Sequence, residues 1–188
     1  MVYLSFFKPL LDFSVAFIVI ILFFPLFIII PFFIVIDSGY PIVFRQKRVG
    51  KNKKEFYIYK FRTMVNGAEQ LGGMTKKNDN RVTRVGKYLR MMSLDEVPQI
   101  FNILKGDMSL VGFRPGLYSH YKKSDFDKNL FSVKPGITGL AQVYGRSSLT
   151  PEKKRELEVE YARKVCFILD LKIILLTFFK VLKKSSVN

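Results

Sequence analysis

Two carboxylates stand side by side in the stretch MMSLDEVPQIFNILKGDMSLVGFRP, residues 91–115. The chain has 31 basic and 15 acidic residues, so the pair formed by Asp95 and Glu96 is conspicuous. A carboxylate that stays ionised can act as a nucleophile or as a metal ligand. The chain has one His and one Cys, His120 and Cys166, so any chemistry must rest mainly on carboxylates and basic residues.

The apolar residues around this pair recur every three to four positions from Leu94 to Leu104, which predicts a helix. Pro98 is tolerated only in a first turn, so the helix should begin between residues 93 and 95. Ser93 and Glu96 also fit a capping box, in which acidic residues complement the helix dipole. The capping and catalytic interpretations are compatible, because the same dipole keeps a carboxylate ionised.

A second candidate site is KPGITGLAQVYGR, residues 134–146, where several glycines precede Arg146. Glycines allow a backbone to approach a ligand, and an arginine can bind phosphate through two hydrogen bonds. A turn-rich loop is the alternative. The sequence contains neither a P-loop nor a GxGxxG motif.

The elements that must position these residues belong to a chain of 188 residues that is both apolar and basic, with a formal net charge of +16. This combination favours anionic, greasy partners such as a phospholipid surface, a lipid phosphate, a nucleotide or a nucleic acid. One cysteine excludes an intramolecular disulfide and a multi-cysteine zinc site. No nucleic-acid-binding motif is present, so nucleic acid is disfavoured.

Residues 13–36 contain no charged side chain, which predicts a membrane segment. Pro25 and Pro31 interrupt it, so a kinked helix could cross the bilayer or a broken helix could return to the same face. The basic run at residues 45–54 places the following chain on the cytoplasmic side. Charge alone leaves the choice between the two topologies open.

DSGYPIVF, residues 37–44, predicts a turn followed by a short strand, residues 55–64 predict a second strand, and residues 65–82 predict a mobile loop. Residues 151–164 predict a charged helix. Residues 165–184 predict either an interfacial amphipathic helix or a packed core helix. In the interfacial interpretation, lysines near its end reach lipid phosphates: Lys180, Lys183 and Lys184.

The order of these motifs resembles the bacterial sugar transferase family, the small monotopic phosphoglycosyl transferases. The resemblance rests on FRQKRVGKNKKEFYIYKFRTM, SLDEVPQIFNILKGDMSLVG, FRP, KPGITGLAQVYGR and FILDLKIILLT, and covers nearly the whole chain. It implies transfer of a phosphosugar from a UDP-sugar to a polyprenyl phosphate such as undecaprenyl phosphate, giving the polyprenyl diphosphate sugar and UMP. In that family this reaction is the first membrane step of bacterial glycan assembly.

The resemblance also implies the site. Asp95 and Glu96 correspond to the family's catalytic pair, with Asp95 as nucleophile and as ligand of Mg²⁺. The expected substrate-binding residues lie on the matching motifs: Lys60, Arg62, Arg90, Arg114, Pro115 and Arg146.

The implied fold is α+β and mostly helical. A re-entrant membrane helix at residues 1–38 precedes a compact cytoplasmic catalytic domain at residues 39–188, with interfacial amphipathic helices at the inner membrane of a bacterial cell. Two positions depart from the family pattern: Phe24 replaces the serine of the helix-breaking Ser-Pro pair, and Phe113 replaces the first proline of a Pro-Arg-Pro motif. The sequence determines neither the sugar nor the oligomeric state.

The rival function from another class is a non-catalytic, membrane-tethered basic module that binds anionic lipid. Net charge and hydrophobicity fit that function. They do not explain the adjacent carboxylates or the glycine-rich segment.

Overall fold

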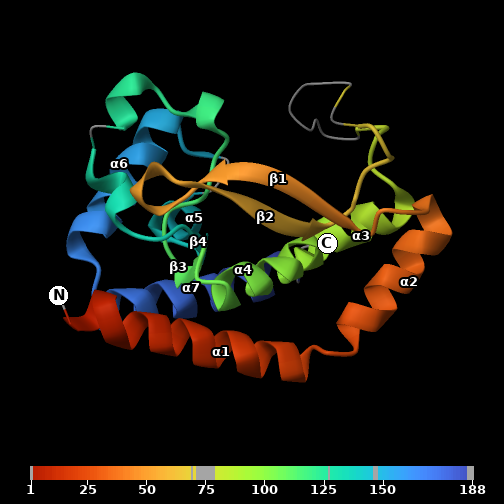
Figure 1. Ribbon diagram of the computed structural model, residues 1–188, viewed down its shortest axis with the longest axis horizontal. Coiled ribbons are helices and arrows are strands. Elements are labelled where there is room, and N and C mark those ends of the chain that lie inside the picture. Colours follow the sequence, from red (N-terminus) through yellow and green to blue (C-terminus); the bar gives the residue numbers. More distant parts are fainter. Residues whose placement is uncertain (1, 69, 71–78, 127, 146–147, 186–188) are drawn as a thin grey trace.

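The computed structural model describes residues 2–68, 70, 79–126, 128–145 and 148–185, without the side chains of residues 181–185. Most described residues are helical and two small sheets accompany them, which confirms the predicted class of fold (Figure 1). The longer helices are α1 (Lys8–Leu22), α2 (Leu26–Ser38), α3 (Arg84–Met92), α6 (Pro151–Lys164) and α7 (Phe167–Ser185). Shorter helices are η1 (Tyr3–Phe7), η2 (Lys51–Lys53), η3 (Leu94–Gln99), α4 (Ile100–Leu104), η4 (Tyr118–His120), η5 (Lys123–Asp125), η6 (Asn129–Ser132) and α5 (Leu140–Tyr144).

The N-terminal apolar segment is a broken helix. After α1 ends, Phe23 leaves the helical conformation and Pro25 starts α2, because proline has no N–H with which to continue the preceding hydrogen-bond ladder. Pro31 is accommodated inside α2. Tyr3–Leu22 has the length and apolar composition to cross a membrane, and no other described helix meets both conditions.

An antiparallel hairpin follows this segment, formed by β1 (Val43–Val49) and β2 (Glu55–Phe61). The second strand lies where residues 55–64 predicted it, whereas the first begins at the end of DSGYPIVF and continues through the basic residues to Val49. A second, parallel pair joins β3 (Ser109–Val111) to β4 (Gly136–Thr138). Residues 69 and 71–78 of the loop predicted at residues 65–82 lie outside the described residues.

Both parts of the broken helix pack on the rest of the molecule. Ala16 of α1 shares an apolar cluster with Ile58 of β2 and Ile103 of α4. Ile34 of α2 shares another with Phe61 and with Leu89 of α3. The hairpin and α4 therefore sit against α1 and α2, and α1 runs along the lower edge in Figure 1.

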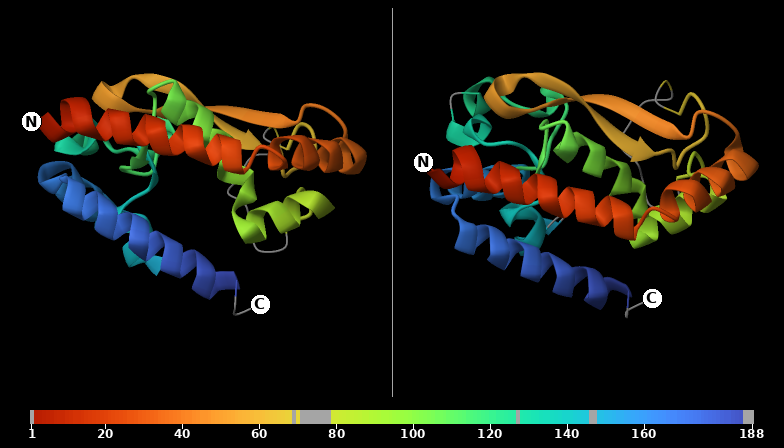
Figure 2. Two further views of the ribbon diagram at one scale, coloured as in Figure 1. Left: turned by 90° about the horizontal axis from the view of Figure 1, so that it is seen from below. Right: turned by 60° about the horizontal axis from the view of Figure 1, so that its bottom comes forward.

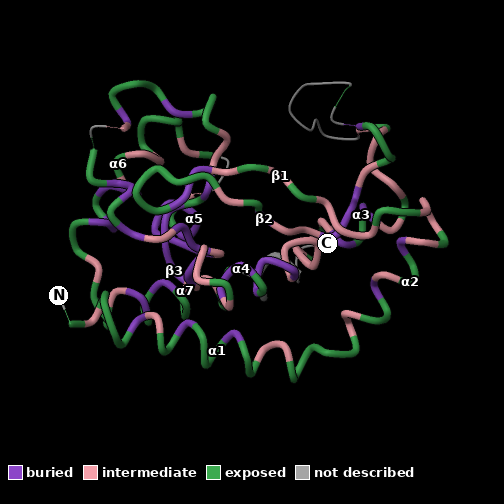
Figure 3. The backbone as a smooth tube through the Cα atoms, in the orientation of Figure 1, coloured by how far each residue is buried: buried purple, intermediate pink, exposed green. Residues whose placement is uncertain are grey.

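The outer faces of α1, α2 and α7 are apolar and exposed, as the tube coloured by burial shows for α1 (Figure 3). Seen from below, α1 and α7 lie across the same side of the molecule (Figure 2). On α7 the polar contacts face inward: Asp170 bonds to Lys8, and Thr177 lies 2.7 Å from the Thr138 hydroxyl. A helix that is polar toward its protein and apolar toward the outside is suited to a lipid environment.

The expected direction of Lys180 was wrong. Its ammonium donates to the backbone oxygen of Val143 in α5, so this lysine binds the protein rather than reaching outward. The side chains of Lys183 and Lys184 lie outside the described residues. The length of a lysine side chain lets it follow either course, and only the position of α5 decides between them.

Candidate active site

Asp95 and Glu96 lie in η3, a tight helical segment between α3 and α4. Ser93 adopts a left-handed conformation, with φ 59°, and turns the chain between α3 and η3. The Ser93 side chain makes no capping hydrogen bond, so the predicted capping box does not form. The carboxylates do stand at the start of a helical segment, and their side chains are left for other partners.

Glu96 is held by two cations. One carboxylate oxygen, Oε1, accepts from Lys60 Nζ at 2.7 Å and from Arg114 Nη2 at 2.9 Å. Burial by itself would raise the pKa of Glu96, but the charges and hydrogen bonds of Arg114 and Lys60 outweigh it and lower the pKa to about 2. Glu96 is therefore ionised at neutral pH.

The surroundings of Asp95 raise the pKa of its carboxyl instead of lowering it. Burial raises the pKa of its carboxyl above the ordinary value of 3.8, and the neighbouring charge of Glu96 raises it further. Lys60 and Arg90 oppose this shift without cancelling it. Within the described part of the chain Asp95 forms no salt bridge, so its carboxylate is not committed to a cation in the way that Glu96 is.

Lys60 reaches the pair from β2, and a residue that the sequence analysis missed fixes that strand. Asn102 of α4 is fully buried, accepts the backbone N–H of Tyr59 at 3.1 Å and donates to the backbone oxygen of Tyr57 at 2.7 Å. Its amide pairs with the edge of β2 much as another strand would. The signal available in the sequence was an amide among the apolar residues of QIFNIL, where Asn102 lies between Phe101 and Ile103.

The other two basic residues predicted to contact phosphate on this side, Arg90 and Arg62, have different partners. Arg90 Nε donates to Thr63 Oγ1 at 2.8 Å and its charge acts on Asp95, so Arg90 lies with the pair. Arg62 is buried, and its Nη2 donates to the backbone oxygens of Ser38 and Gly39 at the end of α2. Its guanidinium thus supports the membrane segment, and Arg62 is left out of the phosphate contacts proposed below.

Arg114 and Pro115 follow β3. Arg114 is exposed and turned toward Glu96, whereas Pro115 is buried and shapes the turn. Phe113, in the position of the family's proline, is fully buried and packs edge-on against Phe131 at 5.5 Å between ring centroids. The substitution therefore adds to the core rather than to the surface that Arg114 shares with Glu96.

The glycine-rich segment serves the fold. A Cβ on Gly136 would lie 2.1 Å from the Gly112 nitrogen, and one on Gly139 would lie 1.9 Å from the Gly112 oxygen. These glycines let β3 and β4 approach each other, which favours the structural alternative for this segment over direct contact with a ligand. Arg146, at the end of this segment, lies outside the described residues.

The donor set for a metal is small. Among the described residues no group of three His, Cys, Asp or Glu side chains could hold an ion. Asp95 is the carboxylate of the pair without a salt bridge to a described residue, while Glu96 already faces two cations. This set fits Mg²⁺ shared between one carboxylate and substrate phosphate oxygens, as is usual for that ion.

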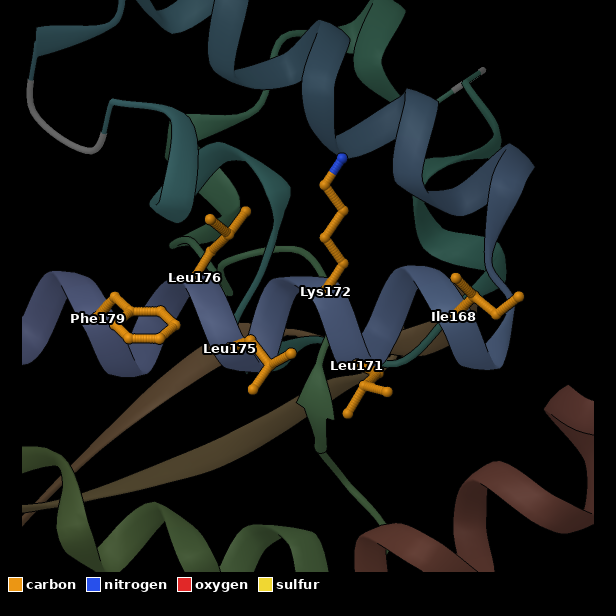
Figure 4. Close-up of a pocket in the computed structure, with 6 residues that line it drawn as sticks. All are labelled: Ile168, Leu171, Lys172, Leu175, Leu176 and Phe179. Carbon is orange, nitrogen blue, oxygen red and sulfur yellow. The ribbon is translucent and has the colours of Figure 1, made fainter.

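An open apolar hollow of about 390 Å³ lies along α7, away from these residues. Figure 4 shows its lining, which contains no carboxylate: Ile168, Leu171, Lys172, Leu175, Leu176 and Phe179. It belongs to the apolar outer face and not to the cluster around Asp95.

Comparison with known proteins points to one family. The profile described as bacterial sugar transferase matches residues 3–184. An uncharacterised sugar transferase, EpsL of Bacillus subtilis, is 43% identical over 151 residues, which are 80% of this chain and 74% of EpsL.

Two larger relatives carry names that state a reaction. A UDP-glucose:undecaprenyl-phosphate glucose-1-phosphate transferase of Klebsiella pneumoniae is 42% identical over 93% of this chain and 40% of its own length. A UDP-N-acetylgalactosamine-undecaprenyl-phosphate N-acetylgalactosaminephosphotransferase of Aeromonas hydrophila is 39% identical over 95% of this chain and 44% of its own length. The chain thus spans less than half of these two relatives.

Proposed function

The chain belongs to the bacterial sugar transferase family, and from that premise we propose that it transfers a phosphosugar from a UDP-sugar to undecaprenyl phosphate. The products are the undecaprenyl diphosphate sugar and UMP. Relatives named for this type of reaction match nearly the whole chain. The observation that carries the proposal is the unequal carboxylate pair: Glu96 is bound by Lys60 and Arg114, and Asp95 beside it has no salt bridge to a described residue.

We propose Asp95 as the nucleophile. An Asp95 oxygen attacks the β-phosphorus of the UDP-sugar, and the bond from that phosphorus to the bridging oxygen breaks. The electron pair leaves with that oxygen on UMP, and the phosphosugar remains on Asp95. An oxygen of undecaprenyl phosphate then attacks the same phosphorus and releases the Asp95 carboxylate.

The basic residues supply charge to this reaction. Lys60 and Arg114 converge on Glu96 and can turn their remaining donors toward a diphosphate, which is how charge on a transferring phosphoryl group is stabilised. Arg90 lies close enough to act on the pKa of Asp95. Glu96 orients Lys60 and Arg114 and lies beside the attacking carboxylate, where it can help to activate the acceptor.

We assign Mg²⁺ to Asp95 together with phosphate oxygens of the donor. The ion would offset the negative charge of the diphosphate. Nucleophilic attack is assigned to Asp95 itself, and the positive charge beside the diphosphate to Lys60 and Arg114. The requirement for the metal is tested in the assay below.

The first test is release of UMP from a panel of UDP-sugars by the detergent-solubilised protein, with and without Mg²⁺ and undecaprenyl phosphate. Asp95→Asn should reduce release by at least about 10³-fold, because an amide cannot replace the nucleophile. Asp107→Asn, in the same motif, is the control and should retain activity. Release that survives Asp95→Asn would refute the mechanism, and no release from any donor would favour the lipid-binding module.

We also propose that the broken helix is re-entrant and that the catalytic part faces the cytoplasm. Both ends of the segment are tied to the same folded body: Lys8 is bonded to Asp170 at 2.6 Å, and Arg62 holds the end of α2. A crossing segment would have to separate its ends by the bilayer thickness of about 30 Å. The basic residues 45–54 favour the cytoplasmic side.

Cysteine labelling tests this topology. Val2→Cys in a Cys166→Ser background should react with an impermeant thiol reagent only after the cells are opened. Lys54→Cys, in the exposed turn of the hairpin, should behave in the same way. Labelling of position 2 in intact cells would establish a crossing helix instead.

A further inference from the structure

Glu158 of α6 is a buried carboxylate that the proposed transfer does not use. It is 6% exposed. Its Oε1 accepts the backbone N–H of Arg114 at 3.1 Å, and its Oε2 accepts from Arg155 Nη1 at 2.7 Å. Its two oxygens therefore join the turn that carries Arg114 to a cation on α6.

Arg155 also contacts Tyr121, which forms a second hydrogen bond to the same turn. Its guanidinium carbon lies 4.3 Å from the centre of the Tyr121 ring, and its Nε lies 3.6 Å from Asp125 Oδ2. The Tyr121 hydroxyl accepts the backbone N–H of Gly116 at 2.9 Å. Glu158 and Tyr121 both contact Arg155. Glu158 accepts the backbone N–H of Arg114, and Tyr121 accepts that of Gly116, so both fix the Arg114–Gly116 turn.

In front of this turn, the Arg114 side chain faces Glu96. That side chain is 54% exposed, so few neighbours restrict its rotamers. Its reach to Glu96 Oε1, 2.9 Å away, depends mainly on where its backbone is held. Burial of the preceding residue, Phe113, anchors the chain before Arg114. The Arg114 backbone N–H itself is held by its hydrogen bond to Glu158.

We propose that Glu158 is a positioning residue for phosphosugar transfer: by binding the Arg114 backbone it places the Arg114 guanidinium beside Glu96 and the donor diphosphate. Glu158 acts through Arg114 and touches neither substrate. This inference rests on the proposed function for its kinetic consequence. The hydrogen bond to the Arg114 backbone is independent of the reaction.

A double-mutant cycle tests the kinetic part. Glu158→Ala should lower kcat/KM for the UDP-sugar by about 10- to 100-fold, the range expected when a substrate-positioning group is misplaced. In the Arg114→Ala background the same change should cost less than about twofold, because the guanidinium it positions is gone. Glu158→Gln keeps an oxygen for the Arg114 N–H and should retain most of the activity.

Glu160→Gln is the matched control. Glu160 lies on the same helix, and its salt bridge among the described residues is an exposed one to Lys164, so kcat/KM should stay within about twofold of the wild-type value. If Glu158→Ala does not fold, the cycle is run with Glu158→Gln, whose smaller loss must also vanish without Arg114. A loss of equal size in both backgrounds would overturn the proposal, since it would show a general structural role.

Hydrogen exchange gives a readout that needs no activity. Glu158→Ala should speed exchange in the peptide covering residues 112–117 by about tenfold or more, and Glu160→Gln should leave it unchanged. Unchanged exchange in Glu158→Ala would overturn the proposal. If the wild-type protein releases no UMP, the proposed function fails, and exchange at this peptide still decides whether Glu158 holds Arg114.

Discussion

Asp95 and Glu96 are adjacent in the chain, yet their surroundings shift their pKa values in opposite directions. Burial raises the pKa of Asp95, while Arg114 and Lys60 outweigh burial at Glu96 and lower its pKa to about 2. Unequal environments are a common way of giving two carboxylates two roles. Here Glu96 remains charged and holds the cations, and Asp95 is the carboxylate of the pair that is protonated first as the pH falls.

The pH dependence of donor cleavage follows from this difference. A nucleophilic carboxylate must be deprotonated, so kcat/KM should be low below the pKa of Asp95 and reach its plateau above it. Because that pKa is raised, the acidic limb should lie above the ordinary value of 3.8. UMP release measured from about pH 4 to about pH 8 should show the limb.

The same experiment on Lys60→Met checks the cause. Lys60 lowers the pKa of Asp95, so its removal should move the acidic limb to higher pH. Lys87→Met, which removes an exposed lysine from α3, should leave the limb where it is. A limb that stays in place in Lys60→Met would show that the titrating group is not Asp95.

At the scale of elements, the contact between α4 and β2 determines whether Lys60 can reach η3. Asn102 makes that contact through its side chain, with hydrogen bonds to the backbone on both sides of Ile58. Its own backbone oxygen also accepts from Asp107 and Met108, which turns the chain toward β3. One residue therefore links the helix after the carboxylates to the strand that carries Lys60.

Asn102→Leu should destabilise the protein by about 2–4 kcal/mol, because the Tyr57 backbone oxygen and the Tyr59 backbone N–H both lose the hydrogen bonds they make to the buried Asn102 amide. Activity should fall with stability, since Lys60 loses its support. Asn129→Ala, at an exposed position, should change stability by no more than about 0.5 kcal/mol. Thermal unfolding in detergent measures both, and equal effects would contradict the role given to Asn102.

At the scale of the whole molecule, a buried polar cluster joins the two ends of the chain. Asp170 of α7 bonds to Lys8 at 2.6 Å and to the hydroxyls of Tyr3 and Tyr161 at 2.6 and 2.7 Å. The same Tyr161 hydroxyl oxygen lies 3.0 Å from the backbone oxygen of Val111 in β3. The start of the membrane segment, α7 and the sheet beside the active site are thus held by one carboxylate.

Lys8→Met tests this attachment. It leaves Asp170 buried without its cation and should cost about 3–5 kcal/mol. Lys164→Met breaks the exposed pair with Glu160 and should cost less than about 1 kcal/mol. A shift in thermal unfolding no larger for Lys8→Met than for Lys164→Met would show that the cluster does not hold the two ends together.

The sequence was sufficient for features that depend on neighbours along the chain. The apolar segment and its interruption by proline, the strand over residues 55–61, the charged helix of residues 151–164 and the resemblance carried by SLDEVPQ all follow from residue type and short-range order. In each case the deciding physics is local: the period of apolar residues, the missing N–H of proline, or a motif read in one stretch.

What only the tertiary structure decided is which partner each polar group finds. Arg62 binds the end of α2, Lys180 turns inward, and Glu158 reaches Arg114. Each of these side chains had several partners within its reach as far as the sequence could tell. The choice depends on segments 20 or more residues away that folding brings alongside, so residue type identified the reactive groups, and the packing of distant elements assigned their contacts.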